Sequence, residues 1–295
     1  MEEIKNACSS CPRRCGIDRK TKKGFCGASG LPRVAKAFLH MWEEPCISGT
    51  KGSGTIFFSG CNLKCAFCQN YPISQENYGK EITIERLAEI CLELQEKGAH
   101  NINLVNPTHY TEAIIQSIKI AKLDIPVIYN SNGYESLEQL KAIEGLVDVY
   151  LPDIKYHGRE SALKYSGCPD YFVHASSAVM EMYRQVGETV FDEDGIIKKG
   201  MIIRHLILPC HTNESIKILD WIRAKLPQDV YVSLMSQYIP FYKAELYPEI
   251  NRRLIRREYD KVLKHFCKLG FENGYVQERN SAEEDYIPAF DLEGV

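Results

Sequence analysis

The sequence predicts an α/β protein built as a partial (β/α)6 barrel that follows a small cysteine-rich N-terminal module. Short apolar runs typical of buried strands alternate, roughly six times, with runs that have helical spacing. Such alternation indicates parallel βαβ units, and a doubly wound open sheet is the alternative fold. In either fold we expect the functional site at the carboxyl ends of the strands.

The expected elements can be given in chain order. The first strand lies within GSGTIFFSG, residues 52–60, an apolar run that ends in glycine. Five more strands are expected at 101–106, 125–133, 147–155, 201–209 and 230–238, and a last short one at 274–277. Helices are expected at 82–98, 110–123, 135–145, 213–226 and 251–269, with an irregular helical stretch up to about residue 187 and a hairpin at 191–200.

The domain prediction has two parts. Residues 1–50 are rich in cysteine, glycine, proline and basic residues, show little periodicity, and are expected to form a metal-organised module. Residues 51–295 are expected to form the barrel and a C-terminal extension.

Composition excludes some functional classes. A net charge of −3 and a pI near 6.3 argue against a nucleic-acid partner, which favours a strongly basic face. No apolar run is long enough to cross a membrane, and the first residues have no apolar signal core. We therefore expect a cytoplasmic protein without a membrane partner.

The chain has twelve cysteines, which in a reducing compartment favours metal binding over disulfides. Seven of them form two clusters near the N-terminus. Most of the scattered ones are expected to be packing residues, with Cys91 and Cys267 the best examples because both lie in helical patterns. These scattered cysteines are Cys46, Cys91, Cys168, Cys210 and Cys267.

Cys61, Cys65 and Cys68 form a C-x3-C-x2-C loop directly after the first expected strand. Three thiolates on a short loop can bind three irons of a [4Fe–4S] cubane and leave the fourth iron open to a substrate-like molecule. A zinc knuckle or a chance trio in a cysteine-rich chain is the alternative interpretation.

This loop resembles the motif of the radical S-adenosylmethionine (SAM) superfamily, including the aromatic Phe67 before the third cysteine. Within the superfamily the chain is similar to the pyruvate formate-lyase activating enzyme-like branch and to PflX-type uncharacterised iron–sulfur proteins. The resemblance covers essentially the full length, through CPRRCGIDR, HMWEEPCISG, GSGTIFFSGCNLKCAFCQNYPIS, VYLPDIKY, IRHLILP and SLMSQY.

The resemblance implies several SAM contacts. Asn106, Thr108 and His109 stand where the family has a Gly-Gly-Glu type segment, and Ser131 and Asn132 belong to a segment that matches Asp-Thr-Asn-Gly. The glycine pair and the Glu are missing here, and Asn130 replaces the Asp of a family cation site. Further matching positions are Asp153 and Lys155, of an Asp-x-Lys segment, and Arg204.

For these residues structural roles are the alternatives. His109 also fits a substrate contact or a helix-start residue, and Asp153 with Lys155 fits a plain salt bridge. Arg204 and His205 point to opposite faces of a strand, so one of them at most faces the barrel interior. Gln237 and Tyr238 follow the sixth strand and either line the substrate end or pack at the rim.

The N-terminal cysteines have the pattern Cys8-x2-Cys11-x3-Cys15-x10-Cys26. Four thiolates on short loops suit structural zinc or an auxiliary iron–sulfur cluster, and both remain open. Cys46 is an alternative ligand.

The predicted function is reductive cleavage of SAM at the cluster, which gives a 5′-deoxyadenosyl radical for hydrogen abstraction. The resemblance implies activation of a glycyl radical enzyme, with a flavodoxin or ferredoxin as electron donor. Modification of a small molecule or peptide is the alternative, and a non-catalytic metal-binding adaptor is the third hypothesis.

Overall fold

The computed structural model describes residues 7–271, 273–276 and 288–295. Its sheet has ten strands in the order β10-β9-β8-β6-β5-β4-β2-β1-β3, with β7 paired to β8. In chain order the strands are β1 (Arg33–His40), β2 (Ser53–Phe58), β3 (Lys80–Glu81), β4 (Ile102–Val105), β5 (Val127–Ser131), β6 (Val149–Pro152), β7 (Val190–Phe191), β8 (Ile197–Leu206), β9 (Tyr231–Met235) and β10 (Gly274–Val276).

The strands from β2 to β10 along this order pair in parallel, whereas β1 is antiparallel to β2. The connecting helices are α1 (Pro45–Ser48), α2 (Tyr71–Ser74), α3 (Ile84–Glu96), α4 (Thr111–Ala121), α5 (Leu137–Ala142), α6 (Arg159–Ser166), α7 (Tyr171–Val186), α8 (Thr212–Lys225) and α9 (Arg256–Lys268), with short 3-10 turns η1 (Thr108–Tyr110) and η2 (Ala244–Leu246). This mostly parallel sheet with helical crossovers confirms the predicted α/β fold class.

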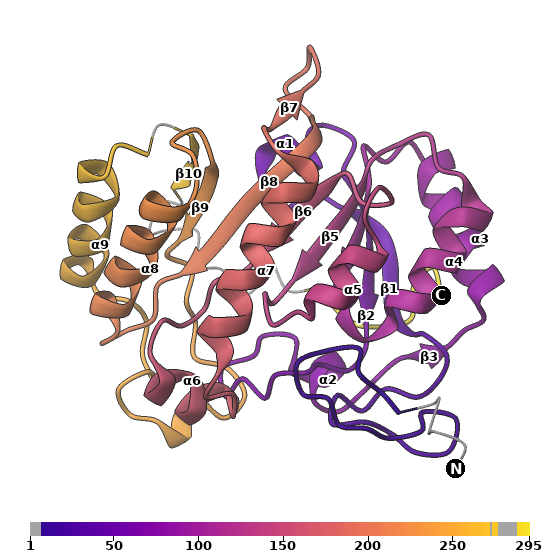
Figure 1. Ribbon diagram of the computed structural model, residues 1–295, viewed down its shortest axis with the longest axis horizontal. Coiled ribbons are helices and arrows are strands. Elements are labelled where there is room, and N and C mark those ends of the chain that lie inside the picture. Colours follow the sequence, from indigo (N-terminus) through magenta and orange to yellow (C-terminus); the bar gives the residue numbers. More distant parts are fainter. Residues whose placement is uncertain (1–6, 272, 277–287) are drawn as a thin grey trace.

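The two faces of the strands have different neighbours. In β2, Ile56 and Phe58 pack in an apolar cluster with Leu87 of α3 and Ile114 of α4, and Phe57 belongs to a separate cluster. Both faces of β2 are therefore buried, which explains its continuous apolar run. The larger helices lie on the outer side of the sheet, while α1 lies at one end of the barrel and α2 and α6 lie at the other (Figure 1).

The expectation of little regular structure before residue 51 is wrong for β1. It pairs along β2, and the amide of Ala37 donates to Glu293 O of the C-terminal segment over 2.8 Å. Burial on both faces removes the alternation that marks a half-exposed strand, and the buried Lys36 interrupts the apolar run. The sheet thus begins before the boundary predicted at residue 51.

The stretch expected to be irregular contains α6 and α7. Each is followed directly by a glycine with positive φ, Gly167 and Gly187. The hairpin is confirmed, because β7 pairs antiparallel with the start of β8. The last strand is confirmed for Gly274–Val276, and residue 277 lies outside the described residues.

The scattered cysteines divide into two groups. Cys46, Cys91 and Cys168 are buried, as expected, but Cys210 and Cys267 are exposed. The buried face of α9 carries Val262 and Phe266, so the next residue is turned away from the core. Among the described residues, no helix combines the length and apolarity that crossing a bilayer requires.

Candidate active site

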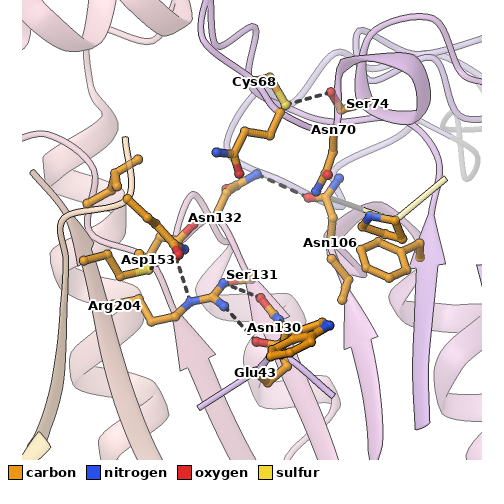
Figure 2. Close-up of a pocket in the computed structure, with 18 of the residues that line it drawn as sticks. Glu43, Cys68, Asn70, Ser74, Asn106, Asn130, Ser131, Asn132, Asp153 and Arg204 are labelled. Carbon is orange, nitrogen blue, oxygen red and sulfur yellow. Dashed lines mark hydrogen bonds and ion pairs between the residues drawn. The ribbon is translucent and has the colours of Figure 1, made fainter. Parts of the chain in front are cut away.

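A cavity of about 680 Å³ opens inside the barrel, where the carboxyl ends of the parallel strands meet. Successive strand ends each contribute to its lining. Figure 2 shows Cys68 at one end of this cavity and Arg204 with Glu43 at the other. The strand-end residues that line it, from β2 to β9, are Cys61, Asn106, Asn132, Asp153, Arg204 and Gln237.

The loop after β2 brings its cysteines to this cavity, and Cys61, Cys65 and Cys68 all line it. Hydrogen-bond donors point at two of the sulfurs. Asn132 Nδ2 lies 3.4 Å from Cys61 Sγ, and Ser166 Oγ donates to Cys65 Sγ over 2.9 Å. Such donors stabilise a thiolate over a thiol.

Burial raises the pKa of the Cys61 and Cys65 thiols to about 11, whereas the nearby Lys155 ammonium opposes that rise. Burial also raises the pKa of Cys68, whose sulfur lies 3.1 Å from Ser74 Oγ. Thiols in such a site ionise when a metal centre supplies the missing positive charge.

The loop begins at a glycine for a steric reason. Gly60 has φ +89°, and a Cβ there would lie 2.6 Å from the carbonyl oxygen of Cys26. The same carbonyl accepts the amide hydrogen of Cys61, with N and O 3.1 Å apart. The first cluster-loop cysteine is therefore held directly by the N-terminal module.

Arg13 forms a second link between the module and the loop. Its Nε donates to Asn62 O over 2.9 Å and its Nη1 to Gly167 O over 2.8 Å. The guanidinium also lies over the ring of Phe25, 4.2 Å from the centroid. The module thus supports the cysteine loop from the outside, where Figure 1 shows it beside α2.

Asp153, Lys155 and Arg204 form an ion cluster on the cavity wall. The two oxygens of Asp153 are divided between Lys155 Nζ at 2.6 Å and Arg204 Nε at 3.0 Å. Burial alone would raise the pKa of Asp153, but the two cations hold it below its ordinary value. The expected shared face of Asp153 and Lys155 is thus observed.

The structure places Arg204 and His205 on opposite faces, as expected. Arg204 lines the cavity, whereas His205 is buried behind the sheet with Nδ1 2.7 Å from Ile154 O. Gln237 and Tyr238 also line the cavity, and Tyr238 donates from its hydroxyl to Ile250 O over 2.8 Å. Tyr238 therefore both lines the cavity and packs at its rim.

The amide side chains Asn106 and Asn132 lie side by side at the cavity, with Asn132 Nδ2 3.3 Å from Asn106 Oδ1. Asn106 has φ +59°, a left-handed conformation that asparagine tolerates. Ser131 also lines the cavity and accepts the amide hydrogen of Gly133 over 3.2 Å.

Thr108 and His109 do not line the cavity in the described part of the chain, so their placement does not support the expected SAM contacts. The left-handed turn at Asn106 precedes η1, and η1 carries both side chains into the protein. Thr108 donates to Glu135 Oε1 over 2.6 Å, and His109 Nε2 lies 2.8 Å from Ser59 O. Burial lowers the pKa of His109 to about 4, so it is a neutral, structural residue.

Sequence reasoning missed one acid, Glu43, in the segment between β1 and α1. Glu43 lines the cavity and pairs with Arg204, Oε2 to Nη1 3.3 Å. The only sequence signal for this residue was a pair of adjacent acids before Pro45. They lie in the stretch HMWEEPCISG, which was noted only because it resembles PflX-type proteins.

Two of the four cysteines of the module lie on the same side of Gly24. A Cβ atom at Gly24 would lie 3.5 Å from both Cys15 Sγ and Cys26 Sγ. Among the described residues, no set of three or more cysteine, histidine or acidic side chains converges on one ion. Metal binding by Cys8, Cys11, Cys15 and Cys26 stays a prediction. Cys46 is instead buried in an apolar cluster beside α1, at the end of the barrel opposite α2 (Figure 1).

A family model for the radical SAM superfamily matches residues 55–222, more than half of the chain. The chain belongs to the radical SAM superfamily. Members of this superfamily use a [4Fe–4S] cluster and SAM, and these are the cofactors of this protein.

The curated relatives of this radical SAM protein include two from Methanocaldococcus jannaschii. The uncharacterized protein MJ0674 is 35% identical over 267 residues, which cover 87% of this chain and 73% of that protein. The uncharacterized protein MJ0808 is 25% identical and covers 82% and 73%.

Two crystal structures of SuiB from Streptococcus suis are also similar to this radical SAM chain. One is bound to the precursor peptide SuiA, with a TM-score of 0.48, 13% identity and coverage of 74% of this chain and 46% of that one. The other is bound to SAM, with a TM-score of 0.47, 12% identity and coverage of 76% and 47%. This chain thus spans less than half the length of SuiB.

The cysteine loop fits a cubane better than a single ion. In a cubane each thiolate binds a different iron, so its ligands need not converge on one point as the ligands of an ion must. The three sulfurs are buried at one cavity end, and donors from Asn132 and Ser166 reach two of them. Hydrogen bonds to cluster sulfurs tune its potential.

Proposed function

We propose that Cys61, Cys65 and Cys68 bind three irons of the cluster and that the cavity below them holds SAM. The observation that carries this proposal is the meeting of three buried thiols and the Asp153–Lys155–Arg204 ion cluster in one cavity. When bound, the cluster supplies the electron that cleaves SAM to methionine and a 5′-deoxyadenosyl radical.

The ion cluster has the chemistry to orient the charged end of SAM. Lys155 donates one hydrogen bond to Asp153, and its ammonium can donate two more from the cavity wall. Asp153 and Cys65 keep the pKa of Lys155 above its ordinary value despite burial, so the ammonium stays charged. We assign Lys155 to the carboxylate of SAM, Arg204 to the carboxylate or ribose, and Asp153 to the positioning of both cations.

The amide groups of Asn106 and Asn132, with Ser131, offer donors and acceptors without net charge beside these ions. We assign them to the amino group and the ribose of SAM, in place of the family's Gly-Gly-Glu and Asp-Thr-Asn-Gly segments. A site closed to water would confine a reactive radical.

For the substrate, we propose activation of a glycyl radical enzyme, as the resemblance to the pyruvate formate-lyase activating enzyme-like branch implies. The 5′-deoxyadenosyl radical would take a hydrogen atom from a glycine Cα of the partner, leaving 5′-deoxyadenosine and a glycine-centred radical. A low-potential flavodoxin or ferredoxin would supply one electron per turnover.

One observation favours a second candidate, modification of a small molecule or peptide. The N-terminal module packs on the cysteine loop through Cys26 and Arg13. The activating enzymes that the chain resembles do not have this module, so a partner would meet a different surface here. Zinc or an auxiliary cluster in the module remains part of this proposal.

The central test is anaerobic reconstitution of wild type and Cys68→Ala, with iron content and 5′-deoxyadenosine formation measured after reduction with SAM present. We expect wild type to form 5′-deoxyadenosine, and Cys68→Ala to lose the product together with the four irons of this cluster. Cys91→Ala is the matched control, because Cys91 is buried in α3 away from the cavity. A wild-type protein that holds zinc alone and forms no product would support the adaptor hypothesis instead.

The two substrate classes are separated by a second assay. A glycine-centred radical signal in electron paramagnetic resonance, seen with a glycyl radical enzyme as partner, supports activation. Its absence with all such partners, together with a new low-molecular-weight or peptide product from cell extract, supports the second candidate.

A further inference from the structure

The floor of the cavity is built by a segment that precedes the matched superfamily region. Residues 41–44 connect β1 to α1, whereas the match begins at residue 55. Met41, Trp42 and Glu43 of this segment line the cavity. Figure 2 shows Glu43 next to Arg204, at the end of the cavity away from Cys68.

The carboxylate of Glu43 is surrounded by hydrogen-bond donors. Its Oε1 accepts from Asn103 Nδ2 over 3.0 Å and from Asn130 Nδ2 over 3.3 Å, and its Oε2 faces Arg204 Nη1 at 3.3 Å. The side chain is only 11% exposed. A group that only accepts hydrogen bonds is needed here, because each neighbour presents N–H.

Glu43 completes the set of groups that fix the guanidinium of Arg204. Nε donates to Asp153, Nη1 to Glu43 and Nη2 to Asn130 Oδ1 over 2.6 Å. Each nitrogen of the planar fork is thus held. Counting partners within the described part of the chain, two of its five N–H bonds remain for a ligand. The direction in which those two point is set jointly by the three acceptors.

The backbone of Glu43 is fixed as well. Its amide donates to Ser48 Oγ over 3.0 Å, and that hydroxyl donates to His40 O over 3.1 Å. The following helix α1 starts with Pro45 and buries Ile47 in the apolar cluster at the end of the barrel opposite α2. These contacts hold the backbone of Glu43 in place.

We propose that Glu43 is a positioning residue for SAM, which holds Arg204 so that its remaining N–H bonds meet the SAM carboxylate or ribose. This inference rests on the proposed function, because it takes Arg204 as a SAM contact. It adds a residue from outside the matched superfamily region to the SAM site.

Glu43→Gln tests the inference, because either orientation of the amide turns its NH2 toward a donor, Arg204 on one side or the two asparagines on the other. Glu44→Gln is the matched control. Glu44 is its neighbour and loses the same charge near Arg204, whose guanidinium it also helps to keep charged. In the described part of the chain, however, Glu44 does not line the cavity, and no hydrogen bond joins it to Arg204.

The readouts on reconstituted protein are the SAM dissociation constant by equilibrium dialysis, iron per chain, melting temperature, and kcat and KM for 5′-deoxyadenosine. We expect Glu43→Gln to weaken SAM binding about tenfold, equivalent to about 1.4 kcal/mol, with iron content kept and KM changed more than kcat. Glu44→Gln should stay within about twofold of wild type. If Glu43→Gln does not fold, Glu43→Asp keeps the carboxylate on a shorter stem and should weaken binding less than tenfold but measurably.

The inference is overturned if Glu43→Gln, or the folded Glu43→Asp, binds SAM as tightly as wild type. It is also overturned if Glu44→Gln weakens binding equally, because loss of charge and not the contact would then be the cause. Failure of the proposed function is a different result, in which wild type itself forms no 5′-deoxyadenosine.

Discussion

Substitution of Gly60 by alanine tests how the N-terminal module holds the cysteine loop. Two costs arise at this position. Gly60 has φ +89°, where an L side chain is strained, and the new Cβ would lie 2.6 Å from Cys26 O. That oxygen is backbone and accepts the hydrogen of the Cys61 amide, so the clash moves the loop or the module and breaks their hydrogen bond.

Gly98 supplies a matched control for the conformational cost alone. It has φ +86°, but a Cβ there meets nothing within 4 Å. Gly98→Ala should therefore cost about 1–2 kcal/mol of unfolding free energy, from the left-handed conformation. Gly60→Ala should cost the same plus about 1–3 kcal/mol for overpacking and about 1 kcal/mol for the lost hydrogen bond, or roughly 3–6 kcal/mol in all.

The assay is guanidinium chloride unfolding of both variants under anaerobic conditions, together with iron content and 5′-deoxyadenosine yield. Gly60→Ala should lose iron and product, because the position of Cys61 changes, while Gly98→Ala keeps both. Equal unfolding free energies for the two variants, or full iron content in Gly60→Ala, would refute the claim that the module positions this loop.

Two further predictions concern the module and the sheet. Arg13→Ala should cost about 2–4 kcal/mol in urea unfolding, because two hydrogen bonds from a guanidinium and its packing on Phe25 are lost. Arg14→Ala, whose ion pair with Glu138 is 70% and 69% exposed, should cost below about 0.5 kcal/mol; similar losses for both would contradict this. Burial lowers the pKa of His205 from 6.5 to about 4. As the pH falls, this imidazole therefore takes up a proton in the unfolded chain before it does so in the folded one, and the free energy of unfolding decreases below pH 6.5. Between pH 7.5 and 5 wild type should lose about 2 kcal/mol more than His205→Gln, and identical pH slopes in unfolding experiments would argue against a neutral buried histidine.

The features that the sequence predicted well depend on local patterns. The loop Cys61–Cys68 follows β2 because an apolar run that ends in glycine is a local signal for a strand and its turn. The shared face of Asp153 and Lys155 follows from the two-residue period of extended backbone. The alternation of strands and helices likewise predicted the α/β class.

The features that the sequence did not predict depend on long-range contacts or on single backbone conformations. The left-handed turn at Asn106 precedes a segment that buries Thr108 and His109 away from the cavity, and alignment to a family motif does not reveal such a turn. Strand β1 lacks alternation because the C-terminal segment covers it, and Lys36 is buried against Asp291. Its burial depends on a partner 255 residues away.

Glu43 shows most clearly why the proposed SAM site and the segment before it form one unit. Its partners Asn103, Asn130 and Arg204 are 60, 87 and 161 residues away, so no local pattern brings them together. A cut at the predicted boundary between residues 50 and 51 would remove the carboxylate and leave Asp153 as the one anionic partner of the guanidinium among the residues that the structure describes. Because removing one partner of a buried ion pair costs about 3–5 kcal/mol, the floor segment and the barrel must fold together for Arg204 to stay in place.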